Sequence, residues 1–294
     1  MGQMLVRQVA KTAGAELAGG TEATGHPALG ADIAAIAGLE AAGLEITDNA
    51  AALIAASDVV IEFSLPAATG EHVDLASLTG VPLVIGTTGH DADQMSQIEA
   101  AAAGTAIVKA MNFSAGVNVL FALTERLAAT LDEDFDIEIV EMHHKHKVDA
   151  PSGTAIGLGE AAAKGRGIEL DAKAVRGRDG ISKERRPGDI GFASMRGGDV
   201  VGEHSVIFAG AGERIELHHK AASREIFAAG AVRAAQWTKG RAAGLYSMKS
   251  VLGFDGEGCA FVNFCSRACS AAHYSGRTYG RQKPRQRSGL CATP

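Results

Sequence analysis

The chain of 294 residues has no apolar run that approaches the roughly 18 residues needed to cross a membrane. Its first residues, Met1 to Met4, lack the cationic and apolar regions of a secretory signal. Positive charge is also in deficit, with a net charge of −6 that gives no reason to expect binding to nucleic acid. We therefore expect a cytoplasmic protein without a membrane or nucleic-acid partner. Its 46% hydrophobic content is enough for one or two cores.

Cysteine is absent from residues 1–258, and the four cysteines that follow have no C-x-x-C spacing. A zinc site at Cys259, Cys265, Cys269 and Cys291 is therefore a weak alternative. The segment 255–294 contains six basic and two acidic residues, whereas the preceding residues carry an excess of acidic ones. Such an abrupt change in composition marks a separate segment, which we expect to be disordered.

The most informative segment is 141–155, which reads Glu-Met-His-His-Lys-His-Lys-Val-Asp-Ala-Pro-Ser-Gly-Thr-Ala. Apolar and acidic residues alternate over 135–142, which predicts a half-buried strand that ends at the histidines. After Pro151, Ser152 is a predicted N-cap for a helix that reaches about Lys164. The segment therefore predicts a strand, a loop and a helix start.

This arrangement suits a small anionic ligand. The helix start at Gly153 and Thr154 offers free N–H groups and a positive dipole end, and Lys147 adds a positive charge. Neighbouring lysines disfavour the cationic forms of His143 and His144, which suits proton transfer near neutral pH. One of these histidines is the candidate acid or base.

Two other interpretations of the segment remain. A charged turn after a strand is often simply solvated. His143, His144 and His146 are also possible metal ligands, but the interleaved lysines would repel a divalent cation. No nearby cysteine or paired carboxylate completes a ligand set, so we expect no metal.

Strands and helices alternate through the first part of the chain, which is typical of a parallel sheet with crossover helices. The later region, 135–219, contains closely spaced strands and predicts a second, mixed sheet. Strands are predicted at 15–20, 57–64, 81–85, 105–109, 135–142, 190–196, 203–209 and 214–219. Helices are predicted at 1–12, 67–78, 91–103, 115–131, 155–164 and 224–239.

Residues 141–155 closely resemble the signature of 4-hydroxy-tetrahydrodipicolinate reductases, the dihydrodipicolinate reductases of bacterial lysine and diaminopimelate synthesis. The resemblance covers residues 1–253. Further segments that are similar to the family are Val84–Gly89, Asn112–Asn118, Gly191–Ala193, Arg196–His204 and Phe227–Ala235.

The resemblance implies an α/β fold, with a Rossmann-like NAD(P)-binding domain at 1–113 and 225–254. An α+β mixed-sheet domain at 114–224 would bind substrate and form a homotetramer, leaving 255–294 as a non-homologous tail. The implied reaction removes water from a hydroxylated ring dicarboxylate and reduces the product with NADH or NADPH. Hinge closure between the two domains is expected before hydride transfer.

The family pattern also implies roles for individual residues. His143 corresponds to the proton donor or acceptor and Lys147 to the proton donor, while His144, Gly153 and Thr154 correspond to substrate-binding positions, with Ser152 beside them. Glu22 matches the acidic residue that binds the adenosine ribose, and Ala23 stands where relatives that prefer NADPH often carry arginine, which favours NADH. The remaining cofactor positions are Met1, Gly86, Thr87, Thr88, Ala110, Met111, Asn112 and Phe113.

The chain departs from this family at its start. A dinucleotide-binding domain begins with an apolar strand and a glycine-rich turn, and we interpret residues 1–5 as the last corner of that turn and the helix after it. We expect the neighbouring strands, at 15–20 and 58–64, to lack a ladder partner. A catalytically impaired relative that binds pyridine dicarboxylates, or only assembles, is therefore the alternative to an active reductase.

Overall fold

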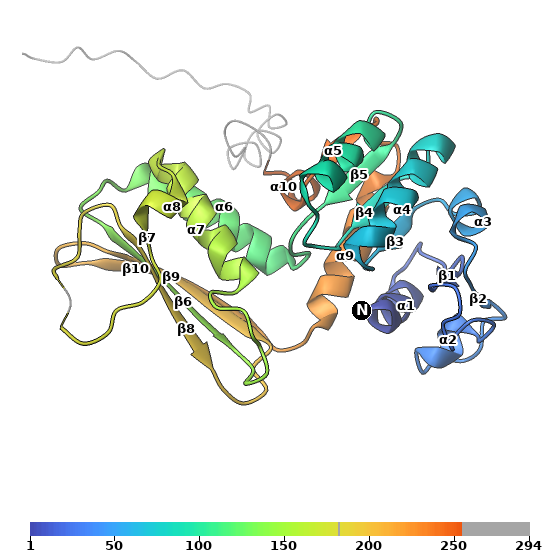
Figure 1. Cartoon of the computed structure of the whole chain (residues 1–294), viewed down its shortest axis with the longest axis horizontal. Coiled ribbons are helices and arrows are strands. Elements are labelled where there is room, and N and C mark those ends of the chain that lie inside the picture. Colours follow the sequence, from blue (N-terminus) through green and yellow to red (C-terminus); the bar gives the residue numbers. More distant parts are fainter. Residues whose placement is uncertain (182, 255–294) are drawn as a thin grey trace, which may run out of the picture. The chain divides into compact units, whose positions relative to one another are not determined.

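The computed structural model describes residues 1–181 and 183–254 (Figure 1). The predictions of a disordered tail and of a weak zinc alternative concern residues 255–294 and lie outside the described residues.

The helices are α1 (Gly2–Lys11), α2 (Ile33–Ile36), α3 (Ala50–Ala55), α4 (Pro66–Thr79), α5 (Ala92–Ala101), α6 (Ala115–Thr130), α7 (Gly153–Arg166), α8 (Leu170–Lys173), α9 (Glu225–Thr238) and α10 (Met248–Leu252). The strands are β1 (Gly20–Thr21), β2 (Ile46–Thr47), β3 (Val60–Glu62), β4 (Leu83–Ile85), β5 (Ala106–Lys109), β6 (Asp136–His143), β7 (Ala174–Val175), β8 (Ile190–Arg196), β9 (Gly202–Ala209), β10 (Arg214–Ala221) and β11 (Gly244–Tyr246).

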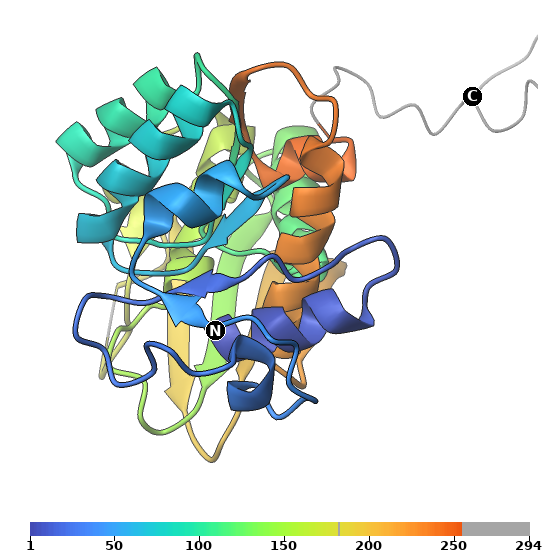
Figure 2. The same ribbon diagram turned by 90° about the vertical axis from the view of Figure 1, so that its right-hand side faces the viewer.

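A four-stranded parallel sheet, in the order β11-β5-β4-β3, forms the centre of the first half (Figure 2). Every residue of β4 is fully buried, as expected for a parallel strand covered on both faces. Helices α4 and α5 pack on one face through Val73 and Ile98, and α1 and α9 pack on the other through Leu5 and Ala231. The predicted Rossmann-like arrangement is confirmed.

The first two strands form a separate sheet. β1 pairs in parallel with β2 alone, and no backbone hydrogen bond joins β1 to β3 in the part of the chain that the structure describes. The prediction of a strand over 15–20 is wrong, because only Gly20 and Thr21 have a ladder partner, at Ile46 and Thr47. Residues 15–19 remain outside the ladder.

A five-stranded mixed sheet, in the order β10-β9-β6-β8-β7, forms the second half and confirms the predicted mixed sheet. β6 lies at its centre, antiparallel to β9 and parallel to β8. Helices α6 and α7 cover one face, where Ile139, Leu158 and Phe208 form the core. The strand pattern of β6 alternates between buried and half-buried residues, as its sequence predicts.

The long helices were predicted to within a few residues of their bounds, and the N-cap of α7 is confirmed: the Ser152 hydroxyl accepts from the Ala155 N–H at 3.2 Å. Short elements were missed, among them α2, α3, β11 and α10. None of the helices that the structure describes is both long and apolar enough to span a bilayer.

Candidate active site

The last residues of β6 place two ionisable side chains on its inner face. Glu141 and His143 are two residues apart, so both point to the side that α7 covers. Glu141 is 1% exposed and His143 is 8% exposed. The His143 Nδ1 lies 2.6 Å from the Glu141 Oε2, a charge-assisted hydrogen bond that fixes the ring.

Arg196, the last residue of β8, completes the pairing of Glu141. Its two terminal nitrogens donate to the two carboxylate oxygens, at 2.8 and 2.9 Å, and the Ser152 N–H donates to the same carboxylate at 3.2 Å. Burial opposes the charge, but the hydrogen bonds from Arg196 and His143 outweigh it and lower the pKa of Glu141. Glu141 is therefore an ionised acceptor.

His143 is held in its neutral form. Burial is the main cause that lowers its pKa, the positive charges of Lys147 and Arg196 add to it, and Glu141 opposes them. With Glu141 ionised, the Nδ1 carries the proton and donates, so the Nε2 is the basic nitrogen. A neutral imidazole with a fixed tautomer is suited to accept a proton.

A second histidine, His204 of β9, packs against His143 with ring centres 5.1 Å apart and a T-shaped geometry. Its Nε2 lies 3.1 Å from the Ser152 hydroxyl. Burial and the neighbouring His143 lower the pKa of His204 to about 4. His204 therefore stays neutral and supports both the His143 ring and the start of α7.

Ser152 is buried, and its hydroxyl contacts the Ala155 N–H and His204. Gly153 and Thr154 follow it as the first residues of α7, and neither N–H has an acceptor among the described residues. The Thr154 hydroxyl accepts from the Asn112 side-chain amide at 3.2 Å, which joins a predicted substrate position to a predicted cofactor position.

Lys147 and His144 lie in the turn between β6 and α7. The Lys147 ammonium pairs with Asp149 at 2.8 Å and remains only partly exposed. His144 is half-buried, and its ring centre lies 6.3 Å from that of His146. Within residues 1–181 and 183–254, no group of three or more His, Cys, Asp or Glu side chains is placed to hold a metal ion.

The loop after β4 contains Gly86, Thr87 and Thr88. A Cβ at Gly86 would lie 2.2 Å from the Phe63 ring, so this position needs glycine because the ring packs on its backbone. Thr87 is buried and its hydroxyl accepts from the Ser64 N–H at 2.8 Å. The loop after β4 is therefore fixed against the loop after β3.

The loop after β5 contains the remaining predicted positions, Ala110 to Phe113. The Asn112 carbonyl accepts from the Asn118 side-chain amide at 2.7 Å, and the Asn112 side-chain oxygen accepts from the Ser114 N–H at 2.8 Å. These two bonds shape the loop before α6. Phe113 is buried, and its carbonyl would lie 1.7 Å from a Cβ at Gly230 of α9. Met111, by contrast, is exposed.

Glu22 follows β1 directly and is exposed, at the end of a strand as predicted. A cavity of about 540 Å³ lies beside it, and its lining includes Gly2, Gln3, Thr21, Glu22, Ser64 and His72. Met1 is half-buried as the N-cap of α1. No contact joins Glu22 or Met1 to the His143 network among the described residues.

Sequence reasoning gave no role to Glu141, Arg196 or His204. Glu141 opens the informative segment, and its place two residues before His143 on a predicted strand is the signal that could have found it. Arg196 and His204 lie more than fifty residues further along the chain, and only the strand pairings of β6 with β8 and β9 bring them to His143.

Comparisons with known proteins relate nearly the whole described chain to one family. Residues 1–113 match the family model for the N-terminus of dihydrodipicolinate reductase, and residues 116–252 match that for its C-terminus. The chain is 54% identical over 253 residues to the 4-hydroxy-tetrahydrodipicolinate reductase of Rhodopseudomonas palustris (strain BisA53), covering 86% of this chain and 93% of the relative. The enzyme of the same description from Ruegeria sp. (strain TM1040) is 53% identical over 253 residues, covering 86% and 94%. A dipicolinate-bound dihydrodipicolinate reductase from Paenisporosarcina sp. TG-14 superposes with a TM-score of 0.66 at 26% identity, covering 84% of this chain and 92% of that one.

Proposed function

The chain belongs to the dihydrodipicolinate reductase family, and we propose that it reduces 4-hydroxy-tetrahydrodipicolinate to tetrahydrodipicolinate, with loss of water and with NADH or NADPH as reductant. The observation that carries the proposal is the buried Glu141–His143 pair beside the open start of α7. A neutral imidazole beside free helix N–H groups supports proton transfer at an anionic substrate.

The substrate is a dicarboxylate, and the start of α7 supplies its binding groups. The N–H groups of Gly153 and Thr154 point out of a 14-residue helix, where the dipole favours a negative charge. Lys147 lies five residues before the N-cap and adds an ammonium group. We assign one substrate carboxylate to these groups and to His144 of the same turn.

His143 and Lys147 serve the proton steps. The neutral His143, held by Glu141 at Nδ1, accepts or returns a proton at Nε2. Lys147 donates a proton to the ring as reduction proceeds, and its ion pair with Asp149 keeps the ammonium within the turn. Neither step requires a metal ion.

The residues around the cavity beside Glu22 fit a dinucleotide. The first N–H groups of α1, at Gly2 and Gln3, have no acceptor in the described part of the chain, and Glu22, which lines the same cavity, would accept from ribose hydroxyls. When bound, the reduced nicotinamide supplies the hydride. Gly86, Thr87, Thr88 and Ala110 to Phe113 would hold its nicotinamide half, which we place next to the substrate because Asn112 bonds to Thr154.

The first experiment is a calorimetric titration with NADH and NADPH, with and without pyridine-2,6-dicarboxylate. Micromolar binding of a cofactor supports the reductase. Binding of the dicarboxylate without a cofactor favours the catalytically impaired relative, for which the separate β1–β2 sheet is the supporting observation.

The role of Lys147 is tested by Lys147→Ala, which should lower kcat/KM by about 100-fold because a general acid is lost. Lys164→Ala is the matched control, since Lys164 is 69% exposed and pairs with Glu125 on the helix surface. Equal losses in the two variants would discard the assignment of Lys147.

We also propose that the protein forms a homotetramer through the outer face of the five-stranded sheet. That face includes Met142, Met195 and Ile207, and α6 and α7 pack on the opposite face (Figure 1). Sedimentation velocity at micromolar concentration should give the mass of four chains. Met195→Glu should shift that mass toward smaller species.

A further inference from the structure

Glu62, the last residue of β3, is a buried carboxylate outside the predicted site. It is 3% exposed, at the carboxyl end of a parallel strand where ligands of such sheets bind. A buried charge persists only where hydrogen bonds compensate for the water it loses. The groups that compensate Glu62 come from the loop after β3 and from α4.

The first loop and its helix supply three of these groups. The hydroxyls of Ser64 and Thr69 both donate to the Glu62 Oε1, that of Thr69 at 3.2 Å, and the His72 Nδ1 lies 3.9 Å from the same oxygen. Because Thr69 donates to Glu62, it accepts from the His90 Nε2 at 3.0 Å. The network therefore reaches from β3 through α4 to His90, two residues before α5.

The second loop, after β4, is tied to the same residues. The Ser64 N–H donates to the Thr87 hydroxyl at 2.8 Å, and the Gly86 N–H donates to the Glu62 carbonyl at 2.8 Å. Burial raises the pKa of Glu62, but the nearby His72 and the hydrogen bond from Ser64 outweigh burial, so its pKa stays below the usual range. The ionised carboxylate therefore binds the loop after β3 through the Ser64 hydroxyl, and the bond from the Ser64 N–H to Thr87 ties the loop after β4 to it.

We propose that Glu62 is a positioning residue, which fixes the loops after β3 and β4 so that Ser64 and Thr87 present one defined surface to the cofactor. The inference rests on the proposed reductase function, because it names what holds the cofactor loops. Glu62 touches neither Glu141 nor His143, so its effect reaches the reaction only through cofactor binding.

The kinetic test is Glu62→Gln, which keeps the shape and removes the charge. KM for NADH should rise by about tenfold, because the hydrogen bonds to a charged carboxylate are replaced by weaker neutral ones. KM for the dicarboxylate substrate should stay within about twofold. Thr69→Val, which removes one donor to the carboxylate, should move KM for NADH in the same direction. Glu71→Gln, the same change on the exposed face of α4, should leave both constants unchanged.

A second measurement does not depend on activity. Amide hydrogen exchange at Ser64 and Gly86 should become faster in Glu62→Gln, while exchange in β6 stays as in the unmodified protein. Faster exchange in both sheets, or an unchanged KM for NADH together with unchanged exchange at Ser64, would overturn the proposal. If the unmodified protein shows no reductase activity, the proposed function fails, and exchange at Ser64 and Gly86 still decides whether Glu62 fixes the loops.

Discussion

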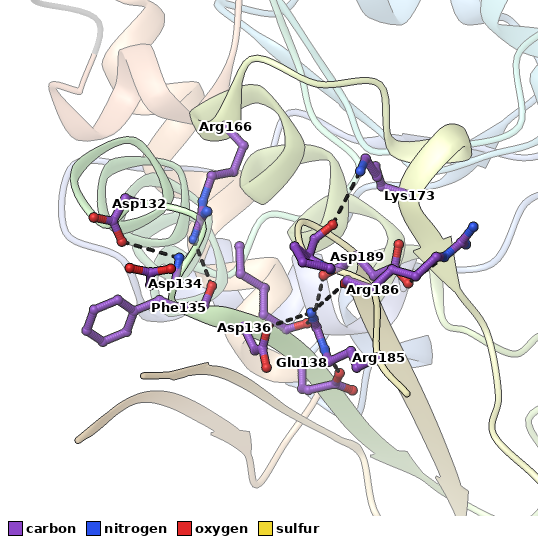
Figure 3. Close-up of polar contacts among 12 residues, drawn as sticks. Asp132, Asp134, Phe135, Asp136, Glu138, Arg166, Lys173, Arg185, Arg186 and Asp189 are labelled. Carbon is purple, nitrogen blue, oxygen red and sulfur yellow. Dashed lines mark hydrogen bonds and ion pairs between the residues drawn. The ribbon is translucent and has the colours of Figure 1, made fainter. Parts of the chain in front are cut away.

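The central strand β6 carries an ion-paired cluster on each face, the outer one with two carboxylates and the inner one with a single carboxylate. Asp136 and Glu138 lie on the outer face near its start, whereas Glu141 lies on the inner face near its end. Both clusters are paired with arginines from residues far along the chain. In Figure 3, Arg185 lies among Asp136, Glu138 and Asp189.

The outer cluster fastens a loop. Arg185 pairs with Asp136 at 2.7 Å and with Glu138 at 3.1 Å, and it also donates to the Ile137 carbonyl at 3.0 Å. Arg178 makes two further bonds of 2.9 Å to Glu138. These ion pairs hold Arg178 and Arg185 to the outer face of β6.

The inner cluster differs in the groups that bond to its carboxylate besides arginine. One arginine, Arg196, neutralises Glu141, and the carboxylate keeps enough acceptor capacity to bond His143 and the Ser152 N–H. The same pair of residue types thus orients the His143 imidazole on one face and holds a loop on the other. The difference lies in what else reaches the carboxylate.

The largest effect should come from Glu141→Gln. The amide offers one acceptor oxygen where the carboxylate has two, so it cannot keep its bonds to His143, to both Arg196 nitrogens and to the Ser152 N–H. The His143 tautomer is then no longer fixed by a charged acceptor, and kcat/KM should fall by about 100-fold. The Arg196 charge also loses its partner, which should lower the free energy of unfolding by about 3 kcal/mol. Steady-state kinetics and urea unfolding measure the two losses.

Glu138→Gln is the matched change on the outer face of the same strand. We expect it to destabilise the protein but to leave kcat/KM within about twofold, because Glu138 does not contact His143. A loss of kcat/KM as large as that of Glu141→Gln would remove the distinction between the two clusters.

The next effect is a loss of stability in acid that comes from His204. Its pKa is about 4 in the folded protein and about 6.5 when unfolded, so the unfolded chain binds the proton first as the pH falls. Its contribution is fully present above pH 6.5, and about 3 kcal/mol is lost as the pH falls to 4.

Urea unfolding at a series of pH values measures this loss. His204→Asn should flatten the profile between pH 6.5 and 4, whereas His26→Asn, in an exposed loop, should not change it. A profile of His204→Asn that coincides with that of the unmodified protein would show that His204 titrates normally.

The sequence predicted the parts of the site that are local. One strand, loop and helix contain the alternation over 135–142, the Ser152 cap and the cluster of His143 and Lys147. Periodicity and spacing were therefore enough to predict these local features. Arg196 and His204 belong to β8 and β9, and only the register of the mixed sheet brings them to β6.

The nucleotide half shows where local patterns were insufficient. Residues 15–20 were predicted as a strand from their apolar side chains. A strand also needs a ladder partner, and among the described residues β2 forms a ladder with Gly20 and Thr21 alone. Glu62 gave no signal either, because its partner Thr69 lies in α4, and His90, which bonds to Thr69, lies before α5. Roles that depend on packing between distant segments need the structure.

A smaller effect is expected from Arg185→Ala on the outer face. Two ion pairs and a bond to the Ile137 carbonyl are lost from a side chain that is 18% exposed, so unfolding should become easier by about 2 kcal/mol. Urea unfolding measures this, and kcat/KM should not change. Arg176→Ala is the control, because among the described residues Arg176 pairs with the highly exposed Asp171 alone.

The smallest effect should come from Arg178→Ala. Its two bonds to Glu138 are well formed, but the side chain is 40% exposed, so water replaces much of what is lost and the cost should be about 1 kcal/mol or less. The double variant Arg178→Ala/Arg185→Ala should cost more than the sum of the two single changes, because Glu138 then loses both partners while half-buried. Additive losses in urea unfolding would mean that the two arginines hold the loop independently, and the outer cluster would then be two separate ion pairs.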